Sequence, residues 1–317
     1  MSILITGGMG FIGLHTARAF LDAGQDVVLT QYRARREPDF IRDELGKRAI
    51  SQVLDVTSHH DAVDIVHQHK PTGIVHLAVP GLAALSAAED FRVNMAGLIN
   101  VLEAAHLNDV PRVVVASSIA VYSGLSQGPF LEDAPLPIES GNPTEAFKKS
   151  WEILSLHWAS RTGVEVIQAR LSGIWGPLYH SMANLPSRLV HAAVKGVPTD
   201  FTGARGGAPF EGDESDFCYV KDAAAGLAAL QLAPSLPHKI YNVAAGVSRS
   251  NGDIANAVKG VIPEAQTNLQ AGRGPRYRPN QYLDVTRANK DVGYQPKYTV
   301  ETGIADYIAW LRAGNAQ

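Results

Sequence analysis

Two hydrophobic periods alternate along the first half of the chain. Short, nearly continuous apolar runs are separated by longer segments in which apolar residues return every three or four positions. The short runs predict buried parallel strands, and the longer segments predict helices. The expected strands are Ile3–Ile5, Asp26–Leu29, Gln52–Leu54, Gly73–Leu77, Arg112–Ala116 and Val164–Ala169. The longest expected helices are Gly13–Ala23, Ala87–Leu107 and Thr144–Thr162.

This alternation is typical of a doubly wound α/β fold, in which helices cover both faces of a parallel sheet. After about Leu171 the elements become shorter, and Gly and Pro are more frequent, as in "GVPTDFTGARGGAPFEG". We therefore predict a first domain over residues 1–172. Residues 173–317 are expected to form mainly a smaller C-terminal substrate lobe, with some segments returning to the first domain. A ligand would bind between them, outside the carboxyl ends of the strands.

The segment "ILITGGMGFIGLHTARAFLDAG" places three glycines between the first strand and the first helix. Gly7 permits a tight turn, Gly10 lets the backbone approach a pyrophosphate, and Gly13 lets the helix pack on the sheet. The start of the helix offers unpaired N–H groups to the phosphates. The spacing predicts a dinucleotide site that includes Phe11 and Ile12, and hence a Rossmann-type sheet.

Further motifs follow in a fixed order: "VHLAVPG", "VNMAGLINVLEAA", "ASSIAVY", "ARLSGIWGP", "DFCYVKDAA" and "YNVAAG". With "TGGMGFIG" at the start, the chain resembles the extended short-chain dehydrogenase/reductase family, which includes the nucleotide-sugar epimerases and dehydratases. The resemblance implies an NAD(P)-dependent oxidoreductase or epimerase that acts at a hydroxyl or carbonyl carbon. It also implies a homodimer built on the helices at Ala87–Leu107 and Thr144–Thr162.

The end of the second strand bears on the choice of cofactor. In the family an acidic residue there binds the ribose 2′-OH of NAD, and the matching position here is Gln31. A 2′-phosphate would meet no repulsion at Gln31, and Arg33 is close enough in sequence to pair with it. We predict NAD(P) with NADP favoured, although the arginines would also fit a solvated face. By resemblance, the cofactor site also includes Asp55, Val56, Leu77, Ala78 and Lys148.

The family's catalytic set is a serine, a tyrosine and a lysine, the last two spaced Y-x-x-x-K. Ser118 matches the serine, which steadies the substrate oxygen. In "GNPTEAFKKSWE", Lys148 and Glu152 match the lysine and the glutamate that often follows it, which leaves Thr144 in the tyrosine position. An alternative register with Phe147 in that position would put a tryptophan in place of the lysine, so we prefer the first.

Thr144 changes the chemistry of the site. A tyrosine near pKa 10 can exchange a proton when a neighbouring ammonium lowers its pKa, whereas threonine is a far weaker and shorter acid. Lys148 can still bind the nicotinamide ribose. Three hypotheses remain. A substitute group supplies the proton, Thr144 holds a relaying water, or the protein is a catalytically silent dinucleotide sensor. The candidate substitutes are Tyr122, Glu145, Tyr179 and His180.

The residues expected on the substrate side depart from those of nucleotide-sugar enzymes. Ser118 is followed by Ile119 and Ala120, not by the two acids of sugar 4,6-dehydratases. Of two arginines that grip a diphosphate in the family, one is Ser215 here and the other remains as Arg278. We predict a smaller or less anionic substrate, unless other arginines compensate. The expected substrate-side residues are Ser118, Trp175, Tyr179, His180 and Arg278, and the arginines that could compensate are Arg205, Arg273 and Arg276.

Composition excludes several other classes of function. A net charge of −3 gives no case for a nucleic-acid partner, and 45% apolar with 19% charged residues fits a globular enzyme. The single cysteine, Cys218, favours a reducing compartment. The chain lacks a signal-peptide pattern and any apolar stretch near the roughly 20 residues of a membrane span. We predict a cytoplasmic enzyme with a small-molecule substrate, no membrane partner and no metal, since the histidines at His59, His60, His67 and His69 lack ligand spacing.

Overall fold

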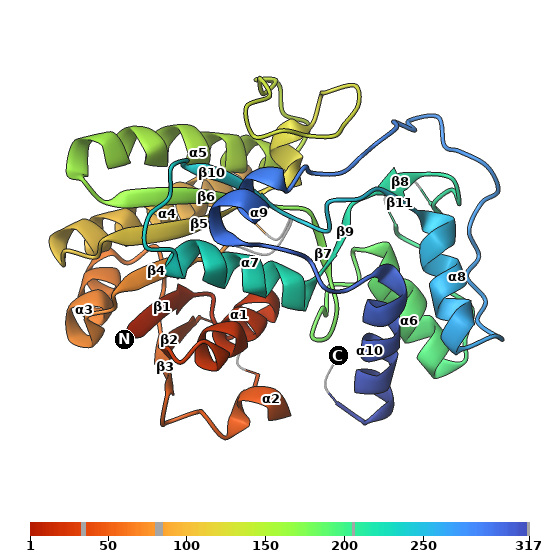
Figure 1. The fold of residues 1–317 in the computed structure, drawn as a ribbon, viewed down its shortest axis with the longest axis horizontal. Coiled ribbons are helices and arrows are strands. Elements are labelled where there is room, and N and C mark those ends of the chain that lie inside the picture. The colour runs from red at the N-terminus through yellow and green to blue at the C-terminus, as the bar shows by residue number, and fades with distance from the viewer. Residues whose placement is uncertain (33–35, 80–84, 205–206, 316–317) are drawn as a thin grey trace.

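The computed structural model describes residues 1–32, 36–79, 85–204 and 207–315, and a seven-stranded parallel sheet forms its centre (Figure 1). The strand order is β10–β6–β5–β4–β1–β2–β3, with the chain reversing direction across the sheet between β1 and β4. This confirms the predicted Rossmann-type fold. The strands are β1 (Ser2–Thr6), β2 (Asp26–Gln31), β3 (Ala49–Val53), β4 (Gly73–His76), β5 (Arg112–Ser118), β6 (Glu165–Leu171) and β10 (Ile240–Val243).

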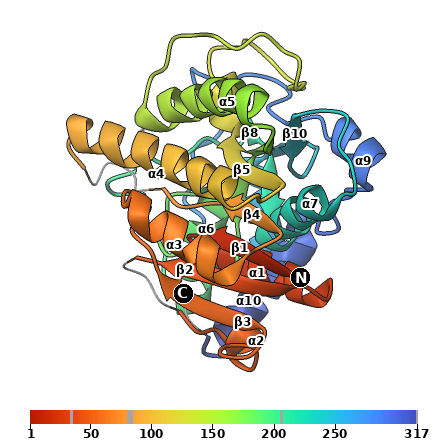
Figure 2. The ribbon, with the colours of Figure 1, turned by 90° about the vertical axis from the view of Figure 1, so that its left-hand side faces the viewer.

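Helices cover both faces of this sheet (Figure 2). Alternate strand residues point to opposite faces, so Ile3 and Ile5 join one core and Leu4 joins the other. The first core lies under α1 (Phe11–Asp22) and α7 (Val220–Leu232). The second lies under α3 (His59–His69), α4 (Ala87–Leu107) and α5 (Pro143–Thr162). Two buried faces explain why the strands are apolar almost throughout.

A second lobe packs around three helices and two small sheets. The helices α6 (Leu185–Lys195), α8 (Asn251–Val261) and α10 (Val300–Arg312) share a core with Trp175 and Tyr219. The small sheets pair β7 (Gly173–Trp175) with β9 (Phe217–Tyr219), and β8 (Glu214–Ser215) with β11 (Arg249–Ser250). The remaining short elements are α2 (Asp39–Arg42), the 3-10 helix η1 (Ile119–Tyr122) and α9 (Thr286–Val292).

Several segments that follow residue 172 pack in the first domain. The strand β10 pairs in parallel with β6 at one edge of the main sheet, and α7 packs beside α1. The other edge is β3, which begins three residues before the predicted start at Gln52. Most of β3 is only partly buried, so its apolar signal is weak. In the part of the chain that the structure describes, no helix is long and apolar enough to cross a bilayer.

Candidate active site

The glycine loop between β1 and α1 forms a cradle made of backbone. Gly7 has a φ of +66°, a conformation that residues with a side chain rarely adopt. A Cβ atom on Gly13 would lie 2.4 Å from the carbonyl oxygen of Gly7, so the helix packs against the loop only because Gly13 has no side chain. Gly10 is the N-cap residue of α1 and provides no side-chain cap. The loop therefore fits a pyrophosphate, whose oxygens accept hydrogen bonds from such a helix start.

The end of β4 lies against this loop. The Thr6 hydroxyl accepts hydrogen bonds from the N–H groups of Leu77 (3.2 Å) and Ala78 (3.3 Å), and it is hydrogen-bonded to Nδ1 of His76 (2.8 Å). A Cβ atom on Gly7 would lie 3.2 Å from the backbone of Ala78. The structure thus brings together the glycine loop and the Leu77–Ala78 segment that the motifs assign to the cofactor.

The end of β2 carries the residues expected to select the cofactor. Gln31 ends the strand, and its side-chain oxygen is buried without a hydrogen-bond partner among the described residues. Arg33 lies outside the described residues. Arg36 lies within them and donates a hydrogen bond to the carbonyl of Leu178, 2.9 Å away in the second lobe.

Asp55 and Val56 follow β3, which is one edge strand of the main sheet. One oxygen of Asp55 accepts hydrogen bonds from the N–H (2.9 Å) and the hydroxyl (2.7 Å) of Thr57, which turns the chain toward α3. Asn100 on α4 donates to the carbonyl of Val56 at 3.0 Å. Both residues are thus fixed near the carboxyl end of the sheet, on the side of β2.

The helix α5 has strong local signals at both ends. Asn142 caps it by accepting a hydrogen bond from the N–H of Glu145, Pro143 occupies the first position, and Gly163 ends it in the left-handed conformation. The Glu145 carboxylate accepts hydrogen bonds from the Gly141 N–H and the Asn142 amide, both at 2.6 Å. Thr144 lies half-buried in the first turn. The helix therefore forms normally with threonine in the tyrosine position.

Lys148 reaches the end of β5 on which Ser118 lies. The Lys148 ammonium donates to the carbonyl of Ala116 at 2.6 Å, two residues before Ser118 on the same strand. It also lies 3.9 Å from the centroid of the Trp151 ring. Burial lowers the pKa of Lys148 to about 7, although the charge of Glu152 opposes this change. The Ser118 hydroxyl accepts a hydrogen bond from the N–H of Ala120 at 3.1 Å and starts η1.

A buried charged cluster lies beneath these two residues. Arg170 on β6 donates to both oxygens of Glu152, at 2.9 and 2.7 Å, and to the hydroxyl of Tyr122 at 2.7 Å. Ser117 on β5 donates to the same carboxylate at 2.5 Å. The four residues are at most 5% exposed. The cluster fixes α5, β5, β6 and η1 relative to one another.

Membership of this cluster argues against Tyr122 as a substitute proton donor. Its side chain is 1% exposed, and its hydroxyl donates to the side-chain oxygen of Asn242 at 2.9 Å while it accepts from Arg170. Burial raises the pKa of Tyr122 to about 12. The hydroxyl therefore already donates one hydrogen bond and accepts another in the interior, and the side chain stays a neutral phenol.

The expected substrate-side residues of the second lobe are dispersed. Trp175 is 1% exposed and packs edge-on against Tyr219 in the lobe core, so the structure argues against a substrate contact. The Tyr179 ring lies edge-on against Phe11 at the start of α1, with 5.0 Å between centroids. His180 is exposed, and burial together with the nearby Arg36 lowers its pKa. Arg278 is exposed and donates to the carbonyl of Leu125 at 2.8 Å.

The site and the fold together agree with a comparison of sequences. A profile of the NAD dependent epimerase/dehydratase family matches residues 3–244. The chain belongs to this family. It is therefore an enzyme of the extended short-chain dehydrogenase/reductase type, as the motifs predict.

Individual relatives of this family member cover nearly its whole length. The UDP-glucose 4-epimerase of Lacticaseibacillus casei is 26% identical over 330 residues, covering 94% of this chain and 92% of the relative. The dTDP-glucose 4,6-dehydratase of Streptomyces griseus is 26% identical over 323 residues, covering 97% and 93%.

Solved structures give the same result. The UDP-glucose 4-epimerase of Thermotoga maritima with UDP-glucose has a TM-score of 0.82 at 20% identity and covers 99% of each chain. MoeE5 in complex with UDP-glucuronic acid and NAD has a TM-score of 0.81 at 25% identity, covering 99% of this chain and 100% of its own. The fold of this family member is thus shared along its full length.

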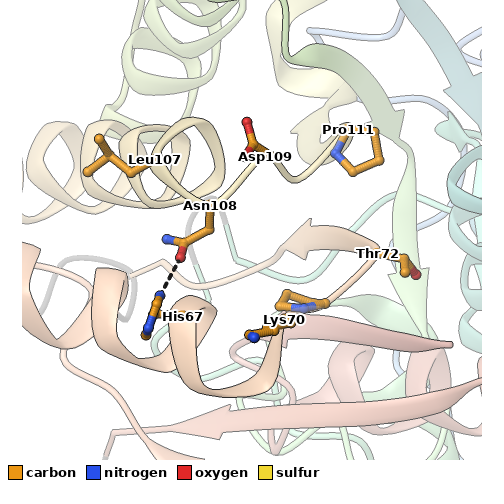
Figure 3. Close-up of a pocket in the computed structure, with 8 residues that line it drawn as sticks. His67, Lys70, Thr72, Leu107, Asn108, Asp109 and Pro111 are labelled. Atoms are coloured by element: carbon orange, nitrogen blue, oxygen red, sulfur yellow. Dashed lines mark hydrogen bonds between the residues drawn. The ribbon is translucent and has the colours of Figure 1, made fainter.

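A crevice of about 460 Å³ in this epimerase-family chain lies away from the site (Figure 3). It opens between the ends of α3 and α4, where His67 and Asn108 share a hydrogen bond of 3.2 Å. Thr72 and Pro111, which line it, directly precede β4 and β5. It therefore lies at the amino ends of the strands, whereas ligands of such sheets bind at the carboxyl ends.

The sequence motifs do not predict the Arg170–Glu152 pair, although Glu152 belongs to the motif that contains Lys148. The two residues are 18 positions apart, and only the packing of α5 on β6 brings them together. A usable signal was present in "VIQARLS", where a charged residue interrupts an otherwise buried strand and so requires a partner.

Proposed function

We propose that this chain is an NAD(P)-dependent oxidoreductase or epimerase that transfers hydride at a hydroxyl or carbonyl carbon, with a proton donor other than tyrosine. The observation that carries the proposal is the hydrogen bond from Lys148 on α5 to the carbonyl of Ala116, two residues before Ser118 on β5. The glycine loop follows β1, which lies two strands from β5 in the same sheet. Binding groups for a dinucleotide and a donor for a substrate oxygen are both present.

Each residue then has a definite task. The glycine loop and the start of α1 hold the pyrophosphate, and Lys148 donates to the nicotinamide ribose. Ser118 donates to the substrate oxygen, on which negative charge develops during reaction. The bound dinucleotide supplies the hydride acceptor. We assign residues 1–172, with the returning strand β10, to cofactor binding, and most of residues 173–317 to substrate binding.

We propose a sugar-like or small polar substrate. The relatives named above act on UDP-glucose and dTDP-glucose, which favours a sugar nucleotide. Two features favour a smaller or less anionic compound. Ser215 stands in place of a phosphate-binding arginine, and Arg278 is already bonded to the carbonyl of Leu125.

A substrate panel tests this function. UDP-glucose, dTDP-glucose and L-threonine would each be incubated with the protein and with NAD⁺ or NADP⁺. Cofactor reduction is followed by absorbance, and epimers are followed by chromatography. L-threonine serves as the small hydroxy compound, since a consensus L-threonine 3-dehydrogenase shares the fold. Tight cofactor binding with no turnover of any compound would favour the silent sensor instead.

We further infer a preference for NADP over NAD. Gln31 brings no carboxylate to the ribose, and Arg33, which lies outside the described residues, follows it closely in sequence. Gln31→Asp is expected to reverse the preference, because a carboxylate accepts the ribose hydroxyls and repels a 2′-phosphate. Titration of both cofactors against both proteins checks this, and equal affinities for the unmodified protein would contradict it.

The outer surfaces of α4 and α5 fit a homodimer interface. They expose large apolar side chains: Phe91 (61%), Ile99 (43%), Ile153 (70%) and Leu154 (48%). The Phe91 ring also lies 6.2 Å from that of Phe147, so the two helices share this surface. We propose that a second copy covers it, since a patch of this kind rarely stays exposed. Sedimentation should show a dimer that Ile153→Glu dissociates, and a monomeric unmodified protein would contradict the proposal.

We also propose a cytoplasmic location. The single cysteine, Cys218, is fully buried, and a protein without a disulfide is suited to a reducing compartment. Fractionation of the cells that produce the protein would test the location directly.

A further inference from the structure

We propose that Lys148 itself carries the proton in this site, taking it from the substrate hydroxyl on oxidation and returning it on reduction, in the place of the missing tyrosine. The inference rests on the proposed oxidoreductase function and deepens it, because it names the group that Thr144 leaves undetermined. It gives Lys148 a second task beside the binding of the cofactor ribose.

The amino group of Lys148 has no fixed counter-charge. Its contacts are the carbonyl of Ala116 at 2.6 Å and the face of the Trp151 ring at 3.9 Å. Within residues 1–32, 36–79, 85–204 and 207–315, no carboxylate lies within ion-pair distance of it. Glu152, one turn further along α5, has both oxygens bound by Arg170. The ammonium thus has a carbonyl and a ring face beside it, but no carboxylate of the described residues within ion-pair distance to oppose the effect of burial.

Two other titratable groups face the amino group in the described structure. Glu152 belongs to the same helix and favours the ammonium form. His76 on β4 is fully buried, and its ring lies 5.1 Å from that of Trp151. Burial and the charge of Lys148 lower the pKa of His76 to about 3, so His76 stays neutral. With burial lowering the pKa of Lys148 to about 7, the amine can both accept and release a proton near neutral pH.

The geometry leaves the amine open toward the substrate. Thr144 precedes Lys148 by one helical turn on the same side of α5, so a threonine and not a phenol ring lies one turn before the amine. Lys148 remains half-buried rather than enclosed. Ser118, which would hold the substrate oxygen, lies two residues beyond the carbonyl that positions the amine.

The alternative proton carriers are occupied or distant. The Glu145 carboxylate accepts two hydrogen bonds at the start of α5. Tyr122 lies in the buried cluster, and Tyr179 packs on Phe11 at the start of α1. His180 lies beside Arg36, which follows β2, and three strand spacings of about 4.8 Å separate β2 from β5.

The step balances in protons and electrons. On oxidation the O–H bond of the substrate breaks, and its proton bonds to Nζ of Lys148, which becomes an ammonium. The C–H bond breaks at the same carbon, its electron pair leaves as hydride to the oxidised nicotinamide dinucleotide, and a C=O bond forms. Reduction is the reverse, with the ammonium as the acid. Ser118 donates a hydrogen bond to the oxygen in both directions.

The first test needs neither cofactor nor turnover. The protein is acetylated briefly with acetic anhydride over a range of pH, and the modification of each lysine is measured by mass spectrometry. Exposed Lys47 serves as the internal reference. Lys148 should reach half of its maximal reactivity well below the pH required by Lys47. A profile that matches that of Lys47 would overturn the proposal, whatever the substrate.

The second test separates proton transfer from binding. Arginine keeps a positive charge for the ribose but does not release its proton. Lys148→Arg should therefore bind NADP⁺ within a few-fold of the unmodified protein, while turnover of the best panel substrate falls by about 10²–10⁴-fold. Lys149→Arg is the matched control, because the amino group of Lys149 points to the carbonyl of Glu139 instead.

The outcomes distinguish this inference from the proposed function. Lys148→Arg with near-normal turnover would overturn the proton role and leave the oxidoreductase standing. No turnover by the unmodified protein, together with a low-pH labelling profile at Lys148, would instead contradict the oxidoreductase and support the environment inferred for the amine.

Discussion

The two halves of the candidate site, the glycine loop and the corner where α5 meets β5, consist of different chemical groups. The glycine loop beside β1 offers backbone groups to a ligand, and its shape depends on residues that lack a side chain. The corner where α5 meets β5 works through side chains, and a buried charged cluster supports it. A backbone site tolerates almost no change in sequence, whereas a side-chain site can lose a catalytic residue and keep its frame. Thr144, at the position where the motif predicts tyrosine, lies in the second half.

Breaking the buried cluster should have the largest effect. Arg170→Met leaves the Glu152 carboxylate buried without its partner, which should lower the free energy of unfolding by about 3–5 kcal/mol. Denaturant unfolding measures this. The double variant with Glu152→Gln leaves no unpaired charge and should recover much of the loss. Equal stabilities of the single variant and the unmodified protein would show that the cluster does not hold the corner together.

Substitutions of the adjacent Ser117 and Ser118 should separate an effect on stability from an effect on turnover. Ser118→Ala removes the donor to the substrate oxygen and should lower kcat about 10²–10³-fold with cofactor affinity unchanged. Ser117→Ala removes a hydrogen bond to the Glu152 carboxylate and should instead lower stability by about 1.5–3 kcal/mol. Steady-state kinetics and unfolding of both variants check the division. Loss of turnover in Ser117→Ala without loss of stability would contradict it.

The glycine loop can be probed with one methyl group. Gly13→Ala would place a Cβ atom 2.4 Å from the carbonyl of Gly7, so the start of α1 must shift, at a cost of about 1–3 kcal/mol. Isothermal titration should show weaker cofactor binding. Gly260→Ala near the end of α8 is the control, because nothing lies within 4 Å of the added atom and alanine favours a helix. Unchanged cofactor affinity in Gly13→Ala would mean that the cradle is looser than the structure indicates.

Lys148 should give stability a pH dependence of smaller size, since the side chain is half-buried and partly screened by solvent. Its pKa is about 7 in the folded state and rises to the ordinary lysine value on unfolding, so the unfolded chain binds more protons between these values. Stability should therefore increase as pH rises through this window. Lys148→Met should flatten that increase. Parallel slopes for both proteins would contradict the lowered pKa.

Thr144→Ala should have the smallest effect. The residue is half-buried in the first turn of α5, so stability should stay within roughly 0.5 kcal/mol of that of the unmodified protein. Turnover should also change little if Lys148 carries the proton. A Thr144→Ala protein as inactive as Ser118→Ala, with normal cofactor binding, would show that the threonine hydroxyl or a water bound to it is the relay.

The same contrast explains what the sequence could predict. The sheet, the glycine loop and the bounds of α4 follow from local patterns, because apolar runs, glycines and a capping box at Ser86 and Glu89 each act within a few residues. The predicted start of β3 at Gln52 is three residues late, because an edge strand is only partly buried.

The side-chain half of the site depends on contacts between distant segments. Motif spacing alone brings Ser118 and Lys148 into one hypothesis, and the structure adds the hydrogen bond from Lys148 to Ala116, two residues before Ser118. Tyr122 was a reasonable candidate for proton transfer by residue type, since a phenol is the missing group. Only the folded chain shows that its hydroxyl is bound by Arg170 and Asn242 in the interior. Long-range partners of this kind leave no short sequence pattern.

The first turn of α5 differs from its later turns in how deeply its residues are buried. Its first turn carries the half-buried Thr144, while Trp151, Glu152 and Ser155 in later turns are buried. The residues that pack the helix into the protein therefore do not include Thr144. A lineage can replace the group at position 144 and keep a folded protein at every step. The first turn of α5 is thus a place where new chemistry can arise by single substitutions.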